Sequence, residues 1–203
     1  MNAQIFWNVI GDYNQHTLIA QIILFVFVIS AGLLSYTGKL KWLAKIALGV
    51  VNLYIGIAFF AWYGTEPIQR FFALPLYLIC GLLFLYEGFF HKDDILEKPD
   101  FWQCVLLLLY LFYPIISFLL GNRFPQMVTH IMPCPVVSLS IAVYAGYQRK
   151  NKLLLVLLII WGLTGVKSVI FHAYEDIILL ICGLYGIGLL WNECKQFRKS
   201  KLS

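Results

Sequence analysis

Charged residues are scarce in this chain of 203 residues: Asp, Glu, Lys and Arg make up 12% of it, and hydrophobic residues make up 61%. Ordinary soluble domains carry about a quarter charged residues. A soluble domain of this size must also expose much of its surface to water. The scarcity of charge therefore excludes an ordinary soluble fold, and a lipid bilayer is the solvent that suits this composition.

Several functional motifs are also missing. The chain has no glycine-rich phosphate loop, dinucleotide fingerprint, zinc-protease helix motif or nucleophile elbow. No Lys or Arg precedes Lys39, and no small-residue cleavage site follows a short apolar core, so we expect the first apolar run to be a retained span rather than a signal peptide. The five cysteines contain no CxxC pair and do not suggest a disulfide framework. No catalytic residue can be assigned from these motifs.

Long apolar runs predict an all-α fold, a polytopic membrane bundle of about seven transmembrane helices. Each crossing needs about 20 mostly apolar residues. Helices are expected because lipid cannot satisfy open backbone groups and the runs lack the alternation of barrel strands. The predicted spans cover residues 16–36, 44–63, 71–90, 102–120, 133–147, 152–171 and 175–191. Together they make residues 1–203 a single membrane domain.

The basic residues predict the orientation. When the loops are assigned alternately to the two sides, Arg70 and Arg123 lie on one side and Lys167 falls within the sixth span. The other side holds twelve of the 15 Lys and Arg residues: Lys39, Lys41, Lys45, Lys92, Lys98, Arg149, Lys150, Lys152, Lys195, Arg198, Lys199 and Lys201. The positive-inside rule then places the N-terminus outside and a basic tail, residues 195–203, in the cytoplasm. The net charge of +5 reflects this orientation toward the lipid bilayer and indicates no nucleic-acid partner.

The residues before the first span predict a further element. Within residues 1–14, the side chains of Ile5, Phe6, Val9 and Ile10 could share one face of a short helix. Such a helix is expected to lie in the outer membrane interface.

Polar side chains gather at the outer ends of the predicted spans. Lys167 lies about one turn inside its span, where a buried ammonium is costly and should pair with Glu175 or Asp176 or extend to the interface. A functional ion or proton site is the alternative. At the inner end, Glu87 is expected to meet Lys92 or water. The candidate ligand-binding residues are Tyr13, Asn14, His130, Cys134, Lys167, Glu175 and Asp176.

The segment 130–135 is the most specific local feature, with Pro133 and Pro135 on either side of Cys134. Proline removes backbone donors and leaves nearby carbonyls free to face a cavity, and proline-interrupted membrane segments are often where binding sites lie. Cys134, His130 and Met132 offer soft ligands that suit a metal such as Cu(I). No other cofactor is expected. The plain alternative is a kinked helix start with a buried thiol.

The order of several short motifs resembles a bacterial family of multi-pass membrane proteins, domain of unknown function 6064. The matching residues are Phe6-Trp7, Tyr13-Asn14, Tyr113-Pro114, Gly121, Pro125, Pro133-Cys134-Pro135, Trp161-Gly162 and Asp176. Where the family pattern has Thr after Pro-Cys-Pro, this chain has Val136, which argues against a hydroxyl-assisted role there. The resemblance implies a location in the bacterial cytoplasmic (inner) membrane, and it implies no activity.

Three hypotheses for function follow. The first is binding or transport of an ion or small solute at an outward-facing site lined by Cys134, His130, Lys167 and Asp176. The second is a membrane enzyme or redox protein with Cys134 as nucleophile or redox thiol and His130 or His172 as base. The third is an accessory subunit with a membrane partner, or a homo-oligomer.

Overall fold

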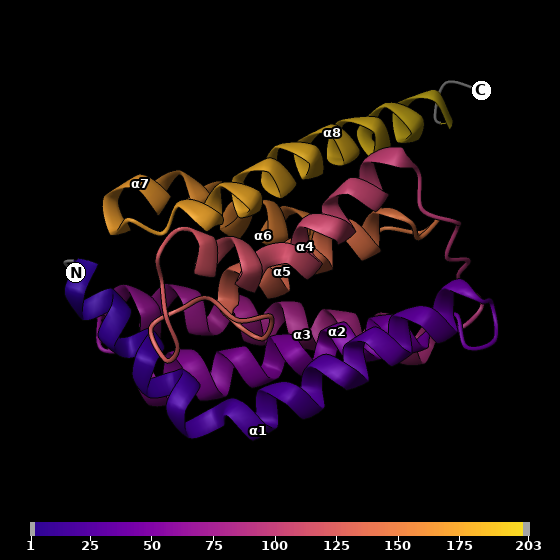
Figure 1. The fold of residues 1–203 in the computed structure, drawn as a ribbon. Helices are drawn as coiled ribbons and strands as arrows, with labels where there is room; N and C mark the ends of the chain where they lie inside the picture. Colours follow the sequence, from indigo (N-terminus) through magenta and orange to yellow (C-terminus); the bar gives the residue numbers. More distant parts are fainter. Residues whose placement is uncertain (1–2, 201–203) are drawn as a thin grey trace.

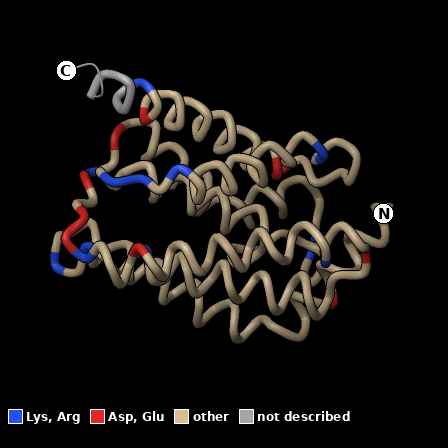
Figure 2. The backbone as a smooth tube through the Cα atoms, turned by 180° about the vertical axis from the view of Figure 1, so that it is seen from behind, with Lys and Arg blue, Asp and Glu red and all other residues tan. Residues whose placement is uncertain are grey.

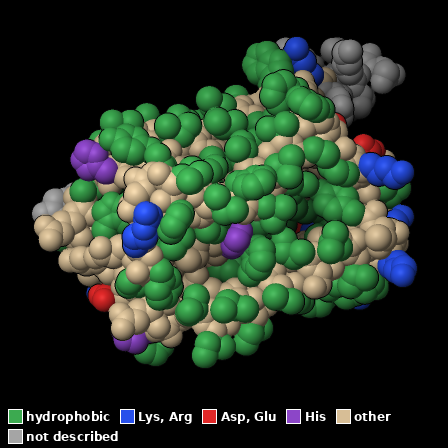
Figure 3. Space-filling model, viewed as in Figure 1, with side chains coloured by type: hydrophobic (Ala, Val, Ile, Leu, Met, Phe, Trp, Pro, Cys, Tyr) green, Lys and Arg blue, Asp and Glu red, His purple; other side chains and the backbone are tan. Residues whose placement is uncertain are grey.

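The computed structural model describes residues 3–200, with side chains described for residues 3–195. The fold class is confirmed: within the described residues every regular segment is helical. Within this described part of the chain, six helices are long and apolar enough to cross a membrane. Hydrophobic side chains cover most of the face seen in Figure 3, as expected for a multi-pass membrane protein.

The helices begin and end close to the predicted spans. In chain order they are α1 (Ala3–Tyr36), α2 (Leu43–Tyr54), α3 (Leu74–Phe90), α4 (Phe101–Leu119), α5 (Pro133–Ala145), α6 (Lys152–Leu163), α7 (Ser168–Phe171) and α8 (Ile177–Ser200). Wider or tighter turns extend several of them: π-helical turns over Ile55–Tyr63 and Gln69–Ala73, and 3₁₀ turns over Thr164–Lys167 and Tyr174–Asp176. Figure 1 shows the helices running along one common direction, with the two ends of the chain at opposite ends of the bundle.

The first helix differs from the expectation. Residues 3–14 are the first turns of α1 and not a separate interfacial helix, although Figure 1 shows α1 changing direction along its length. Val9 and Ile10 are buried because their apolar side chains pack against the bundle. The predicted basic tail, 195–203, falls almost wholly outside the residues whose side chains are described.

Glycines bring two pairs of helices into close contact. A Cβ on Gly49 of α2 or on Gly81 of α3 would lie 3.0 Å from the carbonyl oxygen of the other glycine. A Cβ on Gly162 of α6 would lie 2.7 Å from the Cα of Gly183 in α8. Such close approach needs small residues, which explains why glycine stands at these four positions. The α2–α3 pair and the α6–α8 pair both contact α5, which is almost entirely buried.

The fifth crossing is built differently from the others. The 13 residues of α5 extend only about 20 Å at about 1.5 Å per residue, whereas the hydrocarbon core is about 30 Å thick. The irregular segment 120–132 enters the bundle ahead of α5. His130 Nε2 lies 3.1 Å from the carbonyl oxygen of Leu111, in the middle of α4, and Tyr13 Oη donates to Ile131 O at 2.7 Å. The irregular segment therefore lies inside the bundle next to α4 and leads directly into the short helix α5.

Side chains of neighbouring helices satisfy this irregular backbone. Asn14 Nδ2 donates to Pro125 O at 2.7 Å and to Met127 O at 2.8 Å. Tyr77 Oη donates to the carbonyl of Pro133, the first residue of α5, at 2.6 Å. Irregular backbone is tolerated at membrane depth only where protein groups or a water-filled cavity satisfy it. These bonds therefore explain how the chain can enter the bundle without regular structure.

The Pro-Cys-Pro motif is the first turn of α5. The first helical bond of this turn runs from Val136 N to Met132 O at 3.0 Å. The first N–H groups of a helix have no partner within it, and this is costly away from water. Because Pro133 and Pro135 lack an N–H, only Cys134 among the first three residues of α5 carries a donor. The motif therefore suits a helix that begins inside the bundle.

Charged residues gather toward the end of the bundle where α8 ends, as Figure 2 shows; we name this the basic end and the opposite end the N-terminal end. Inside the basic end, Lys45 Nζ lies 2.9 Å from Glu87 Oε2 and 2.6 Å from Asp94 Oδ2. Tyr144 Oη donates to Glu87 at 2.9 Å, and the Tyr147 ring centroid lies 4.4 Å from Nζ. We name these five residues the Lys45 cluster. Glu87 therefore pairs with Lys45 and not with the expected partner, Lys92 or water. The outside position of the N-terminus stays a prediction.

A candidate solute cavity at the N-terminal end

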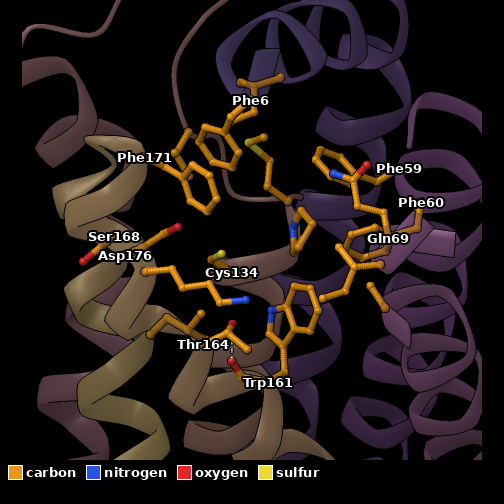
Figure 4. A pocket seen from close by; sticks show the side chains of 18 of the residues that line it. Phe6, Phe59, Phe60, Gln69, Cys134, Trp161, Thr164, Ser168, Phe171 and Asp176 are labelled. Carbon is orange, nitrogen blue, oxygen red and sulfur yellow. Dashed lines mark hydrogen bonds between the residues drawn. The ribbon is translucent and has the colours of Figure 1, made fainter. Parts of the chain in front are cut away.

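A cavity of about 320 Å³ lies between the two glycine-packed helix pairs. One wall comes from the π-helical turns beside α2 and α3, the other from the region of α6 to α8, and Cys134 lies between them (Figure 4). Phe6 and Ile10 of α1, Glu66 and Met132 also line it. Members of the two walls include Phe59, Phe60, Gln69, Phe72, Trp161, Thr164, Lys167, Ser168, Phe171 and Asp176.

The helices depart from regular α geometry where they line this cavity. Phe59 and Phe60 lie in the π-helical turns over 55–63, and Gln69 begins the second π-helical segment. Thr164 and Lys167 bound a 3₁₀ turn on the opposite wall. Mid-helix 3₁₀ stretches and π turns are frequent at functional sites. The irregular turns thus coincide with the cavity.

Aromatic rings form most of the apolar wall and pack on one another. Phe6 and Phe171 stack with their centroids 5.0 Å apart. Trp161 meets Phe60 edge-on at 5.4 Å and Tyr77 at 5.1 Å. Ring pairs in these geometries stabilise one another beyond the area that they bury. The wall is therefore ordered by its own contacts and suits an apolar or aromatic ligand body.

Asp176 supplies a carboxyl group to the cavity. Tyr113 Oη donates to its Oδ1 at 2.9 Å, and Cys134 lines the same cavity. Only 8% of Asp176 is exposed. The first turn of α5 also carries the positive end of the helix dipole, which favours a carboxylate beside it. Two predicted residues, Cys134 and Asp176, are thus brought together at one point of the lining.

Glu175 lies beside Asp176 in the chain but outside the cavity lining. Its Oε1 accepts from Ser117 Oγ at 2.7 Å and from Asn122 Nδ2 at 3.2 Å. These bonds join the start of α8 to α4 and to the segment 120–132. The structure therefore gives Glu175 a supporting position and not the predicted position in a binding site.

Lys167 lines the cavity as predicted, but its expected partner is different. Within the described part of the chain, no ion pair joins Lys167 to Glu175 or Asp176. The reason is that Tyr113 and Ser117 of α4 hold the two carboxylates. Lys167 itself is exposed. Its ammonium therefore stays available at the cavity.

His130 is separated from the other predicted metal ligands. Met132 and Cys134 line the cavity, whereas the His130 ring stacks on Phe25 of α1 at 4.1 Å and bonds to α4. Among the described residues, no group of three or more His, Cys, Asp and Glu side chains could hold a metal ion. The soft-metal site stays a prediction with one donor fewer than expected. A Cys134 nucleophile would likewise lack His130 as its base.

Tyr13 and Asn14 have supporting positions. Both are fully buried, and their polar groups bond to backbone carbonyls of the segment 120–132. Neither lines the cavity. The sequence reasoning missed Gln69 and Thr164, which do. No motif marks either residue, because the turns that aim them into the cavity are visible only in the fold.

A model of a family of unknown function, DUF6064, matches residues 3–201. The chain belongs to this family. The resemblance inferred from the short motifs is therefore confirmed. No curated protein and no solved structure matches the chain significantly. In this DUF6064 chain several of those motifs converge. Tyr113 bonds to Asp176, which lines one cavity with Cys134, while Tyr13 and Asn14 hold the segment that leads to α5.

Proposed function

We propose that this membrane protein binds a small organic solute in the cavity at its N-terminal end. The observation that carries the proposal is the lining itself, in which Cys134, Asp176 and Lys167 face a space walled by aromatic rings. Ligand sites of about 300–1,000 Å³ are mostly apolar with a few placed polar groups. The volume of about 320 Å³ suits a molecule at the small end of this range.

The chemistry of the lining favours an organic solute over a metal ion. A metal site needs several donors at one point, and His130 faces away from the cavity. Aromatic rings give an organic body a large contact area. The charged groups Asp176 and Lys167 then provide orientation.

The position of the cavity supports transport as the finer form of the proposal. Transporter sites often lie where a short or broken helix begins, between packed helix groups. Here α5 begins at the cavity, and the Lys45 cluster joins α2, α3 and α5 at the other end. Release of a solute toward the basic end would require these contacts to separate. Sidedness follows the predicted outside position of the N-terminus.

Access to the cavity can be tested through the native thiol of Cys134. Membrane vesicles are treated with 2-aminoethyl methanethiosulfonate, and the peptide containing Cys134 is analysed by mass spectrometry. We expect Thr164→Trp, which fills the cavity, to slow modification about tenfold or more. The matched control Val166→Trp places the same ring two residues away on an exposed position and should leave the rate unchanged. Equal rates in the two variants would contradict the proposal.

Solute binding is then measured as protection of Cys134 from the same reagent. The probes are small amines, carboxylates, amino acids and sugars. We expect at least one chemical class to slow modification in a saturable manner in the wild type, because a bound solute covers the thiol. A reactive Cys134 that none of these classes protects would also contradict the proposal.

A further inference from the structure

The indole N–H of Trp161 faces the cavity without an acceptor. Trp161 lines the cavity, and its Nε1 is buried with no hydrogen-bond partner among the described residues. Figure 4 shows this nitrogen on the side of the ring that faces the cavity. A buried donor without a partner is costly, and such groups are rare in native folds. The arrangement therefore calls for a ligand that carries a hydrogen-bond acceptor.

A positive charge lies on the same wall. Lys167 follows Trp161 across the 3₁₀ turn and also lines the cavity, and it is not paired with the neighbouring acidic residues. An ammonium and an indole N–H together suit a carboxylate, because hydrogen bonds to charged groups are roughly twice as strong as neutral ones. This wall therefore selects an anionic acceptor.

At a second point of the cavity, the carboxyl group of Asp176 favours a cationic group on the ligand. Tyr113 occupies one position on this carboxylate, and an ionised carboxylate can accept about four hydrogen bonds in all. The stacked rings of Phe6 and Phe171 line the same cavity, and aromatic faces attract cations. An ammonium group on the ligand would meet a carboxylate and aromatic rings.

Resting on the proposed function, we propose that the solute is zwitterionic: a small molecule with an ammonium group, a carboxylate and an apolar body. Its ammonium binds at Asp176, its carboxylate binds at Trp161 Nε1 and Lys167, and its body contacts the aromatic wall. Hydrophobic amino acids are the simplest molecules with this chemistry.

Three probes that share one phenyl ring test separately whether the ammonium and the carboxylate of the ligand are needed. L-phenylalanine carries both charges, phenethylamine lacks the carboxylate and 3-phenylpropionate lacks the ammonium. The readout is the concentration of each probe that halves modification of Cys134. We expect L-phenylalanine to protect at a concentration about tenfold or more below either other probe, the size expected for one charge-assisted hydrogen bond. Equal or better protection by phenethylamine or 3-phenylpropionate would overturn the zwitterion proposal.

Three variants test the assigned contacts. Trp161→Phe keeps a ring but removes the N–H, and Lys167→Gln removes an exposed charge; each should weaken L-phenylalanine and 3-phenylpropionate about tenfold and leave phenethylamine unchanged. Asp176→Asn should weaken L-phenylalanine and phenethylamine and leave 3-phenylpropionate unchanged. If Asp176→Asn fails to fold, the other two variants still decide the matter. Uniform weakening of all three probes would overturn the assignment.

The two proposals fail in different ways. If other solutes protect the wild type but L-phenylalanine does not, the zwitterion proposal fails and the solute cavity stands. If protection is the same in Thr164→Trp as in Val166→Trp, the cavity is not the binding site and both proposals fail.

Discussion

Lys45 Nζ lies 2.6 Å from Asp94 Oδ2, and neither side chain reaches the molecular surface. Glu87 approaches the same ammonium at 2.9 Å, so two carboxylates share one buried cation. Removing one partner of such a group leaves an uncompensated buried charge, which costs far more than the intact group contributes. The stability of the basic end is therefore expected to depend on the charge of Lys45.

Replacing Lys45 with Met tests this dependence. We expect Lys45→Met to lower the free energy of unfolding by about 3–5 kcal/mol, measured by thermal or denaturant unfolding in detergent. The control is Arg149→Met, which removes an ion pair with Asp93 whose side chains are 63% and 69% exposed. Exposed pairs contribute at most about 1 kcal/mol. Equal effects would show that burial does not strengthen the Lys45 interactions.

The hydroxyl of Tyr13 is expected to hold the segment 120–132 in place. Tyr13→Phe leaves the Ile131 carbonyl without its donor and should cost about 1–3 kcal/mol of stability. Hydrogen exchange in residues 120–132 should become faster, as measured by mass spectrometry. Tyr86→Phe, at a 51% exposed position, should change neither quantity. Unaltered hydrogen exchange of residues 120–132 in Tyr13→Phe would contradict the supporting role of the Tyr13 hydroxyl.

Gly183 is expected to tolerate no side chain. A Cβ there would lie 2.7 Å from the carbonyl carbon of Gly162 and 3.0 Å from Leu163 N, and backbone atoms cannot rotate away. We expect Gly183→Ala to cost about 1–3 kcal/mol through overpacking and to slow solute access by shifting α6 against α8.

Gly188→Ala is the matched control for this prediction, since a Cβ there meets nothing within 4 Å. Alanine favours helix over glycine by up to about 1 kcal/mol, so this variant should be neutral or slightly stabilising. A destabilised Gly188→Ala would mean that α8 has a packing partner at this position.

The predicted orientation can be tested with reporter fusions in a bacterial host. A green fluorescent protein joined after Ser203 should fluoresce, because the basic end is expected to face the cytoplasm. Alkaline phosphatase joined after Asn122 should be active, because this loop is expected outside. An active phosphatase joined after Ser203 would reverse the orientation.

Much of the fold was predictable from the sequence. Six of the seven predicted spans match helices that are long and apolar enough to cross a membrane. The remaining predicted span, residues 133–147, matches the short helix α5. In the candidate site, the positions of Cys134, Lys167 and Asp176 at one cavity agree with the expectation.

What the sequence by itself determined was therefore the number, type and limits of the crossings, because lipid as the solvent makes the length of an apolar run decisive. The tertiary structure alone decided which polar groups meet: Lys45 with Glu87 and Asp94, and His130 with α4 rather than with Cys134. The physical reason is that the lipid-facing and buried sides of a membrane helix are both apolar. No amphipathic period then shows how each helix is turned about its axis.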